Sequence, residues 1–152
     1  MKPKFLNYAI WITVSMAVMT SCGASSKVVL SSNVDINQYK YVVLGNSSTG
    51  NNALNDVVLA VQNMIANTNL TVLQASTYSD VIAYSGHVLT PIINIKSETY
   101  GGGHTYITVT FYDFFTDQCL AVVKSSGIGM TIEHDQQLAL RAIEKKLNTI
   151  FN

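Results

Sequence analysis

Residues 106–112 read Tyr-Ile-Thr-Val-Thr-Phe-Tyr, and this stretch decides the fold. Apolar side chains alternate with hydroxyl-bearing ones, which is the period of a β-strand with one buried and one polar face. The same alternation starts at Ile92, before the glycines at 101–103. A turn over 113–118 and a returning strand from Leu120, ending before Gly127, complete an expected antiparallel unit.

Two segments carry the helical period instead. Apolar residues recur at i, i+3, i+4 and i+7 over 54–65, after Asn52 as a plausible N-cap, and again over 138–150. Shorter strands are expected at 39–44, 70–73 and 81–84. The sequence therefore predicts an α+β fold: a mostly antiparallel sheet of about five to six strands, with two amphipathic helices packed on one face.

The amino terminus has the pattern of an export signal. Lys2 and Lys4 precede an apolar stretch of about 14 residues, roughly 21 Å as a helix, which is too short for a bilayer core of ~30 Å. The stretch ends in Met19-Thr20-Ser21-Cys22, which resembles the lipobox of bacterial lipoproteins. The resemblance implies cleavage after Ser21, diacylglycerol on the Cys22 thiol and a further acyl chain such as palmitate on the new amino group. An ordinary secretory signal that ends near a cysteine is the alternative.

These features give an expected domain organisation. We expect a signal peptide at 1–21, a lipidated cysteine and flexible tether over 22–36, and a single α+β domain over 37–152. By analogy with other lipoproteins, the lack of an Asp beside Cys22 favours the outer membrane, facing the periplasm. Once the two lysines of the signal are removed, seven basic and nine acidic residues remain and no basic patch is visible, which argues against nucleic-acid binding.

The order of elements resembles a group of envelope αβ modules. These are the amino-terminal domain of TolB, the CsgG-type secretion lipoproteins and the small lipoprotein activators of peptidoglycan synthases. The shared features are a first strand at 39–44, a helix over the sheet, an Asp-led strand at 80–85, a polar turn at Asp113 and a closing helix. The resemblance implies a role in assembling complexes or activating other proteins, with a core that is not catalytic.

Motifs for bound cofactors fail at the decisive positions. The loop 45–52 has glycines at Walker A spacing, but Asn51 and Asn52 replace the phosphate-binding lysine and the magnesium-binding hydroxyl residue, so no nucleotide is expected. The histidines at 87, 104 and 134 have no metal-ligand spacing, although a site assembled from distant residues stays open. Ser85 and His87 are sequence neighbours, which is not the geometry of a catalytic triad.

Two further features have a structural and a functional interpretation. Cys119 is expected to be a small, mostly buried strand residue, whereas a reactive thiol needs a neighbour that lowers its pKa. Asp113 and Asp117 bracket a polar turn, so we expect them to cap backbone amides rather than to form a hydrolytic pair.

The candidate surface is the polar face of the central strand, with Tyr106, Thr108, Thr110 and Tyr112. It is either a solvated face or a partner-facing one, because tyrosine is enriched at interfaces. Phe114 and Phe115 either cap the core or form an apolar contact. We predict a non-enzymatic accessory or assembly module that binds another envelope component, without metal, nucleotide or other cofactor. The alternative is a lipoprotein that binds a small ligand or glycan, with tyrosines as stacking platforms.

Overall fold

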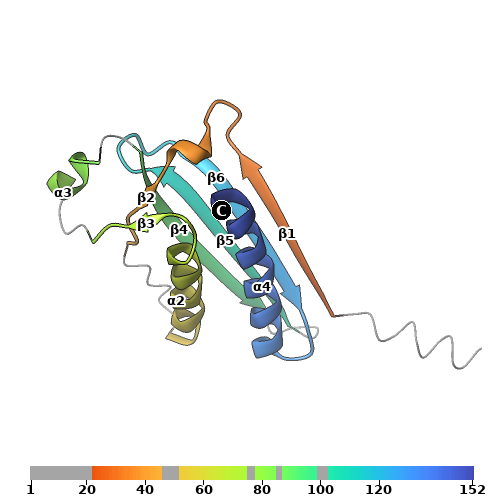
Figure 1. Cartoon of the computed structure of the whole chain (residues 1–152). Coiled ribbons are helices and arrows are strands. Elements are labelled where there is room, and N and C mark those ends of the chain that lie inside the picture. The colour runs from red at the N-terminus through yellow and green to blue at the C-terminus, as the bar shows by residue number, and fades with distance from the viewer. Residues whose placement is uncertain (1–21, 46–51, 75–77, 85–86, 99–102) are drawn as a thin grey trace, which may run out of the picture.

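A computed structural model describes residues 22–45, 52–74, 78–84, 87–98 and 103–152 (Figure 1). The expected signal peptide at 1–21 and most of the loop 45–52 lie outside the described residues.

Six strands of the described chain form one sheet in the order β1-β6-β5-β4-β2-β3. The long strands β1, β6, β5 and β4 pair antiparallel, while the short β2 pairs parallel with both β4 and β3. The strands are β1 (Gly23–Leu30), β2 (Tyr41–Val42), β3 (Thr71–Val72), β4 (Val88–Glu98), β5 (His104–Asp113) and β6 (Cys119–Ile128).

The predicted α+β class is confirmed, but the sheet is mixed rather than mostly antiparallel. The reason is the helix α2 (Asn52–Ala66), which links β2 to β3. A helical crossover returns the chain in its original direction, so the strands on either side of it pair parallel.

Helices α2 and α4 (Ile132–Phe151) cover one face of the sheet (Figure 1). The predicted helix faces are confirmed, because Val61 and Ile65 of α2 and Ile143 of α4 are fully buried. Helix α2 packs against β4 and α4, while α4 lies over β1, β5 and β6. The rings of Phe111 of β5 and Phe151 of α4 meet edge to face at 5.0 Å. Each such side chain contributes roughly 1.5–3 kcal/mol by leaving water. Two short helices, η2 (Ile36–Gln38) and α3 (Tyr78–Ile82), complete the described elements.

Three local predictions are wrong. The strand expected at 81–84 is replaced by the end of α3, whose first turn carries Asp80. Strand β6 runs through Gly127, where a Cβ would lie 2.2 Å from the Asp135 carbonyl oxygen, so this glycine lets α4 approach the sheet instead of ending the strand. Cys119 is exposed rather than buried, because it is the first residue of β6.

The flexible tether expected over 22–36 is also wrong for Gly23–Leu30. These residues form β1, which pairs with β6 residue by residue from Gly23 opposite Ile128 to Leu30 opposite Ala121. Val28 packs against the core, which gives the segment a reason to stay ordered. The sheet therefore begins directly after Cys22.

Candidate functional site

The candidate site is the face of the sheet that no helix of the described chain covers (Figure 1). The predicted row of β5, with Tyr106, Thr108, Thr110 and Tyr112, lies on this open face, while Ile107, Val109 and Phe111 between them are fully buried. Tyr106 is the most exposed of the row, at 38 %. The structure thus brings the four predicted residues together on one surface, and their role in binding stays a prediction.

Strands β4, β6 and β1 add an apolar band to the open face. Ile92 pairs with Thr110, Thr110 pairs with Val122, and Val122 pairs with Val29 of β1. Ile92 and Val29 are among the exposed large hydrophobic residues of the chain. Apolar side chains in line with hydroxyl groups give a surface of mixed character, as in protein interfaces.

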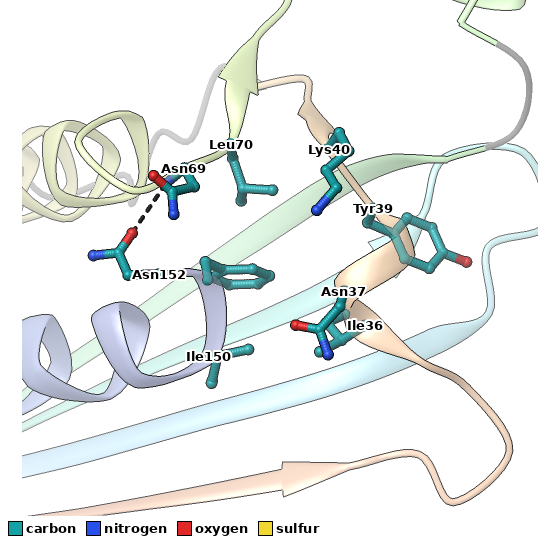
Figure 2. A pocket seen from close by; sticks show the side chains of 9 residues that line it. Ile36, Asn37, Tyr39, Lys40, Asn69, Leu70, Ile150 and Asn152 are labelled. Carbon is teal, nitrogen blue, oxygen red and sulfur yellow. Dashed lines mark hydrogen bonds between the residues drawn. The ribbon is translucent and has the colours of Figure 1, made fainter.

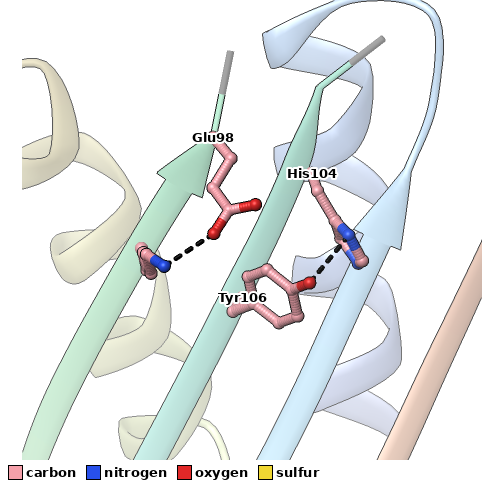
Figure 3. Close-up of polar contacts among 4 residues, drawn as sticks. Glu98, His104 and Tyr106 are labelled. Carbon is pink, nitrogen blue, oxygen red and sulfur yellow. Dashed lines mark hydrogen bonds and ion pairs between the residues drawn. The ribbon is translucent and has the colours of Figure 1, made fainter. Parts of the chain in front are cut away.

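A polar cluster closes one end of the open face (Figure 3). Tyr106 Oη lies 2.8 Å from His104 Nδ1, and the two rings stack with centroids 4.0 Å apart. The contact fixes the orientation of Tyr106, whereas His104 Nε2 is buried and has no hydrogen-bond partner among the described residues.

In the same cluster, Lys96 Nζ lies 2.6 Å from Glu98 Oε1. The hydrogen bond between them raises the pKa of Lys96 and lowers that of Glu98. Both side chains are well exposed, so water screens the pair and it adds little to stability.

The open face also carries two lysines directly opposite each other, Lys27 of β1 and Lys124 of β6. Like charges at directly paired positions of a sheet repel. A negatively charged group bound beside these two lysines would reduce this repulsion.

Asp113 has a structural role at the opposite end of β5. Its Oδ1 accepts hydrogen bonds from the amides of Phe115 at 2.9 Å and Thr116 at 2.8 Å, and its Oδ2 accepts one from Tyr39 Oη at 2.8 Å. Burial alone would raise the pKa of the Asp113 carboxyl, but these hydrogen bonds outweigh burial and hold the pKa below its usual value. Burial and the same bond to Asp113 raise the pKa of Tyr39 to about 12.

The capping predicted for Asp113 is confirmed, and Asp117 occupies the left-handed turn position with φ 54°. Phe114 and Phe115 are both half-buried, and their rings meet at 5.4 Å. They lie in the turn after β5, and their expected apolar contact with a partner stays a prediction.

The other candidate residues stay apart. His87 is exposed and its ring lies 6.0 Å from that of Tyr39, while His134 is exposed at the start of α4. Within the described ranges, no three His, Cys, Asp or Glu residues gather as metal ligands would. Ser85 lies outside the described residues.

Two hollows lie near the carboxyl-terminal end of α4. One, of about 120 Å³, is closed on one side by the hydrogen bond from the Asn69 amide to Asn152 Oδ1 at 3.0 Å (Figure 2). The other, of about 310 Å³, is an open groove between β1 and α4, beside Leu30 and Ile150. Ligand pockets span roughly 300–1,000 Å³ and enclose most of the ligand. The first hollow is smaller than this, and the second is an open groove that would not enclose a ligand, so neither favours the small-ligand alternative.

Sequence reasoning missed the contribution of β1 to the open face. The run Lys27-Val28-Val29-Leu30 did carry a signal, because its two adjacent β-branched valines favour a strand.

Among the described residues, no helix combines the length and apolarity needed to cross a bilayer. No family model matches the chain, and no curated protein sequence matches it.

Three solved structures resemble the fold. A PelC dodecamer from Paraburkholderia phytofirmans is 11% identical, with a TM-score of 0.51 over 85% of this chain and 98% of that one. A single-substitution variant of the same dodecamer is 12% identical, with a TM-score of 0.52 over 84% and 99%. A PDZ domain protein from Parabacteroides distasonis is 10% identical, with a TM-score of 0.48 over 91% of this chain and 38% of that one. At these identities, the likeness to PelC is one of fold alone.

Proposed function

We propose that this chain is a lipoprotein, anchored through Cys22 to the periplasmic side of the outer membrane, that binds another envelope component as an accessory or assembly module. One observation carries the proposal: the open face includes β1, and Cys22 directly precedes β1. The anchor therefore directly precedes a strand of the binding face, so it holds this face close to the membrane.

The composition of the open face supports binding rather than simple solvation. Tyrosine contributes a large contact area with few rotatable bonds, and it is enriched where binding energy concentrates. Tyr106 is already held by His104, so less side-chain entropy is lost when a partner covers it. The apolar band through Ile92 and Val29 adds area that gains from leaving water.

The PelC structures of similar fold are dodecamers. A further copy of this chain is therefore one candidate partner for the open face.

Site-directed photocrosslinking in intact cells tests the proposal. A benzophenone amino acid is placed at Tyr106 or Ile92 on the open face, and at Leu59 of α2 as a control. Leu59 is 56 % exposed and lies in the helical layer on the other side of the sheet. We expect discrete adducts from the two open-face positions and none from Leu59.

Adducts from Leu59 alone, or from none of the three positions, would contradict the proposal. As a second check, Tyr106→Ala combined with Tyr112→Ala removes both aromatic rings of the row. If every recovered partner stays bound to this double variant, the open face is not the binding surface.

A further inference from the structure

Three exposed apolar side chains lie in or beside the turn between β6 and α4. Ile128 is 41 %, Met130 85 % and Ile132 38 % exposed. We call these three residues the apolar tip. Methionine has an unbranched, flexible side chain, and the transfer of an apolar side chain of this size out of water is favourable.

The apolar tip lies beside Cys22. Gly23 pairs directly with Ile128, so the residue before Gly23 lies next to the start of the turn. The beginning of β1, the end of β6 and the beginning of α4 all lie at the same end of the sheet, away from the carboxyl terminus (Figure 1). A lipid on Cys22 would thus enter the bilayer beside these three side chains.

The turn that carries Met130 is braced. The amide of Gly129 donates a hydrogen bond to Oδ1 of Asp135, which is fully buried, and the Thr131 side chain caps α4 by accepting from the His134 amide at 3.2 Å. A Cβ on Gly129 would lie 2.8 Å from both Asp135 Oδ1 and His134 Nδ1, so the backbone is held close to the helix. The backbone that carries Met130 therefore lies in a turn that these hydrogen bonds hold in place on both sides.

The apolar tip itself carries no charge, and the charged residues nearest to it along β1 and β6 are lysines. No charged residue occurs over 125–132, and Glu133 follows on the exposed first turn of α4. The paired lysines, Lys27 and Lys124, lie four positions back from the tip along β1 and β6, roughly 13 Å at ~3.3 Å per residue. Amphipathic segments bury their apolar side chains ~5–10 Å into the boundary between headgroups and acyl chains. With the apolar tip at that depth, the two lysines would lie near the lipid phosphates.

We propose that the apolar tip inserts into the surface of the same membrane that holds Cys22, with Lys27 and Lys124 beside anionic headgroups. This inference rests on the proposed lipid anchor and adds an orientation to it. With a second contact beside the anchor, the sheet is held at a fixed angle to the membrane instead of swinging about one residue. The open face is then presented to its partner in one direction.

Fluorescence of the full-length lipoprotein in vesicles tests the inference. In a Cys119→Ser background, Met130→Cys is labelled with an environment-sensitive nitrobenzoxadiazole dye, and Leu59→Cys serves as a control at another exposed position. The vesicles contain phosphatidylethanolamine and phosphatidylglycerol, with or without a nitroxide-bearing lipid. We expect a blue-shifted emission at position 130 that the nitroxide lipid quenches, and water-like, unquenched emission at position 59.

The outcomes separate the inference from the anchor on which it rests. If the protein floats with the vesicles and its mass shows the lipid, but the dye at position 130 stays water-like, the tip inference is wrong and the anchor stands. If the dye is shielded but not quenched by nitroxide lipid, a second copy covers the tip and the inference is again wrong. If the protein carries no lipid and does not float, both the anchor and the inference fail.

Discussion

The first prediction concerns the hydrogen bond between Tyr39 and Asp113, which joins two parts of the chain that lie far apart in the sequence. Tyr39 follows η2, and Asp113 ends β5 at the turn into β6. The Tyr39 hydroxyl donates to Asp113 Oδ2 at 2.8 Å, and Asp113 is buried. Tyr39→Phe removes the donor and keeps the ring, so the carboxylate loses one of its three partners without a change in packing.

The expected loss follows from the charge of the acceptor. A hydrogen bond to a charged group contributes about 1.5–3 kcal/mol, and leaving a buried acceptor unpaired costs about the same. We therefore expect Tyr39→Phe to lower the free energy of unfolding by about 1.5–3 kcal/mol at pH 7.

The loss should depend on pH in a defined way. The pKa of Asp113 is lowered by folding, so its stabilisation is present above the unfolded pKa of about 4 and disappears as the pH falls through the folded value. The pKa of Tyr39 is raised to about 12, so its stabilisation is present below pH ~10 and disappears as the pH rises through the folded value. The difference between wild type and variant should be flat between about pH 5 and 9 and shrink on both sides.

Urea denaturation of the chain from Gly23 onward, followed by far-ultraviolet circular dichroism at a series of pH values, measures this difference. A variant as stable as the wild type at pH 7 would show that the bond is not made. A loss of the same size at pH 3 as at pH 7 would show that Asp113 ionisation has no part in it.

Two substitutions test the packing of the fold. Val61→Asp places a charge without a partner at a fully buried position of α2 and should destabilise by several kcal/mol, so a fully stable variant in thermal melts would refute the assigned helix face. Gly127→Ala should cost about 1–3 kcal/mol because its Cβ would meet the backbone of α4, whereas Gly23→Ala, with nothing within 4 Å, should be neutral. Equal melting temperatures for the two alanine variants would contradict the close approach of α4 to β6.

Local patterns predicted much of the fold. The alternation over 106–112 placed Ile107 and Val109 in the core and Tyr106 and Thr108 on the other face, because the side-chain period of a strand leaves no third choice. The helical period over 54–65 identified the buried face of α2 in the same way. Both patterns report only which side of a helix or strand a residue lies on, and this follows from the local sequence without any distant contact.

The elements that were mispredicted depend on distant contacts. The start of β1, Gly23-Ala24-Ser25-Ser26, has the composition of a linker and becomes a strand because β6 offers a free edge. The short run at 81–84 fits a strand or a helix equally well by periodicity, and in the structure its first two residues end α3, with Val81 buried.

The candidate site was predictable only in part. The row of β5 follows from alternation, but Val29, Val122 and Ile92 joined it through the register of three strand pairs, which no local pattern encodes. The position of Cys22 beside Ile128 follows from the same register. The sequence therefore indicated an anchor and a surface separately, and pairing between β1 and β6 connects them.

The most direct test of the proposed function is the mass of the mature protein extracted from the cell envelope. We predict an amino-terminal Cys22 whose thiol carries diacylglycerol and whose amino group is acylated, and we predict that Cys22→Ala abolishes both the lipid and the membrane attachment. A mature protein that begins elsewhere, or that retains an unmodified Cys22, would contradict the account.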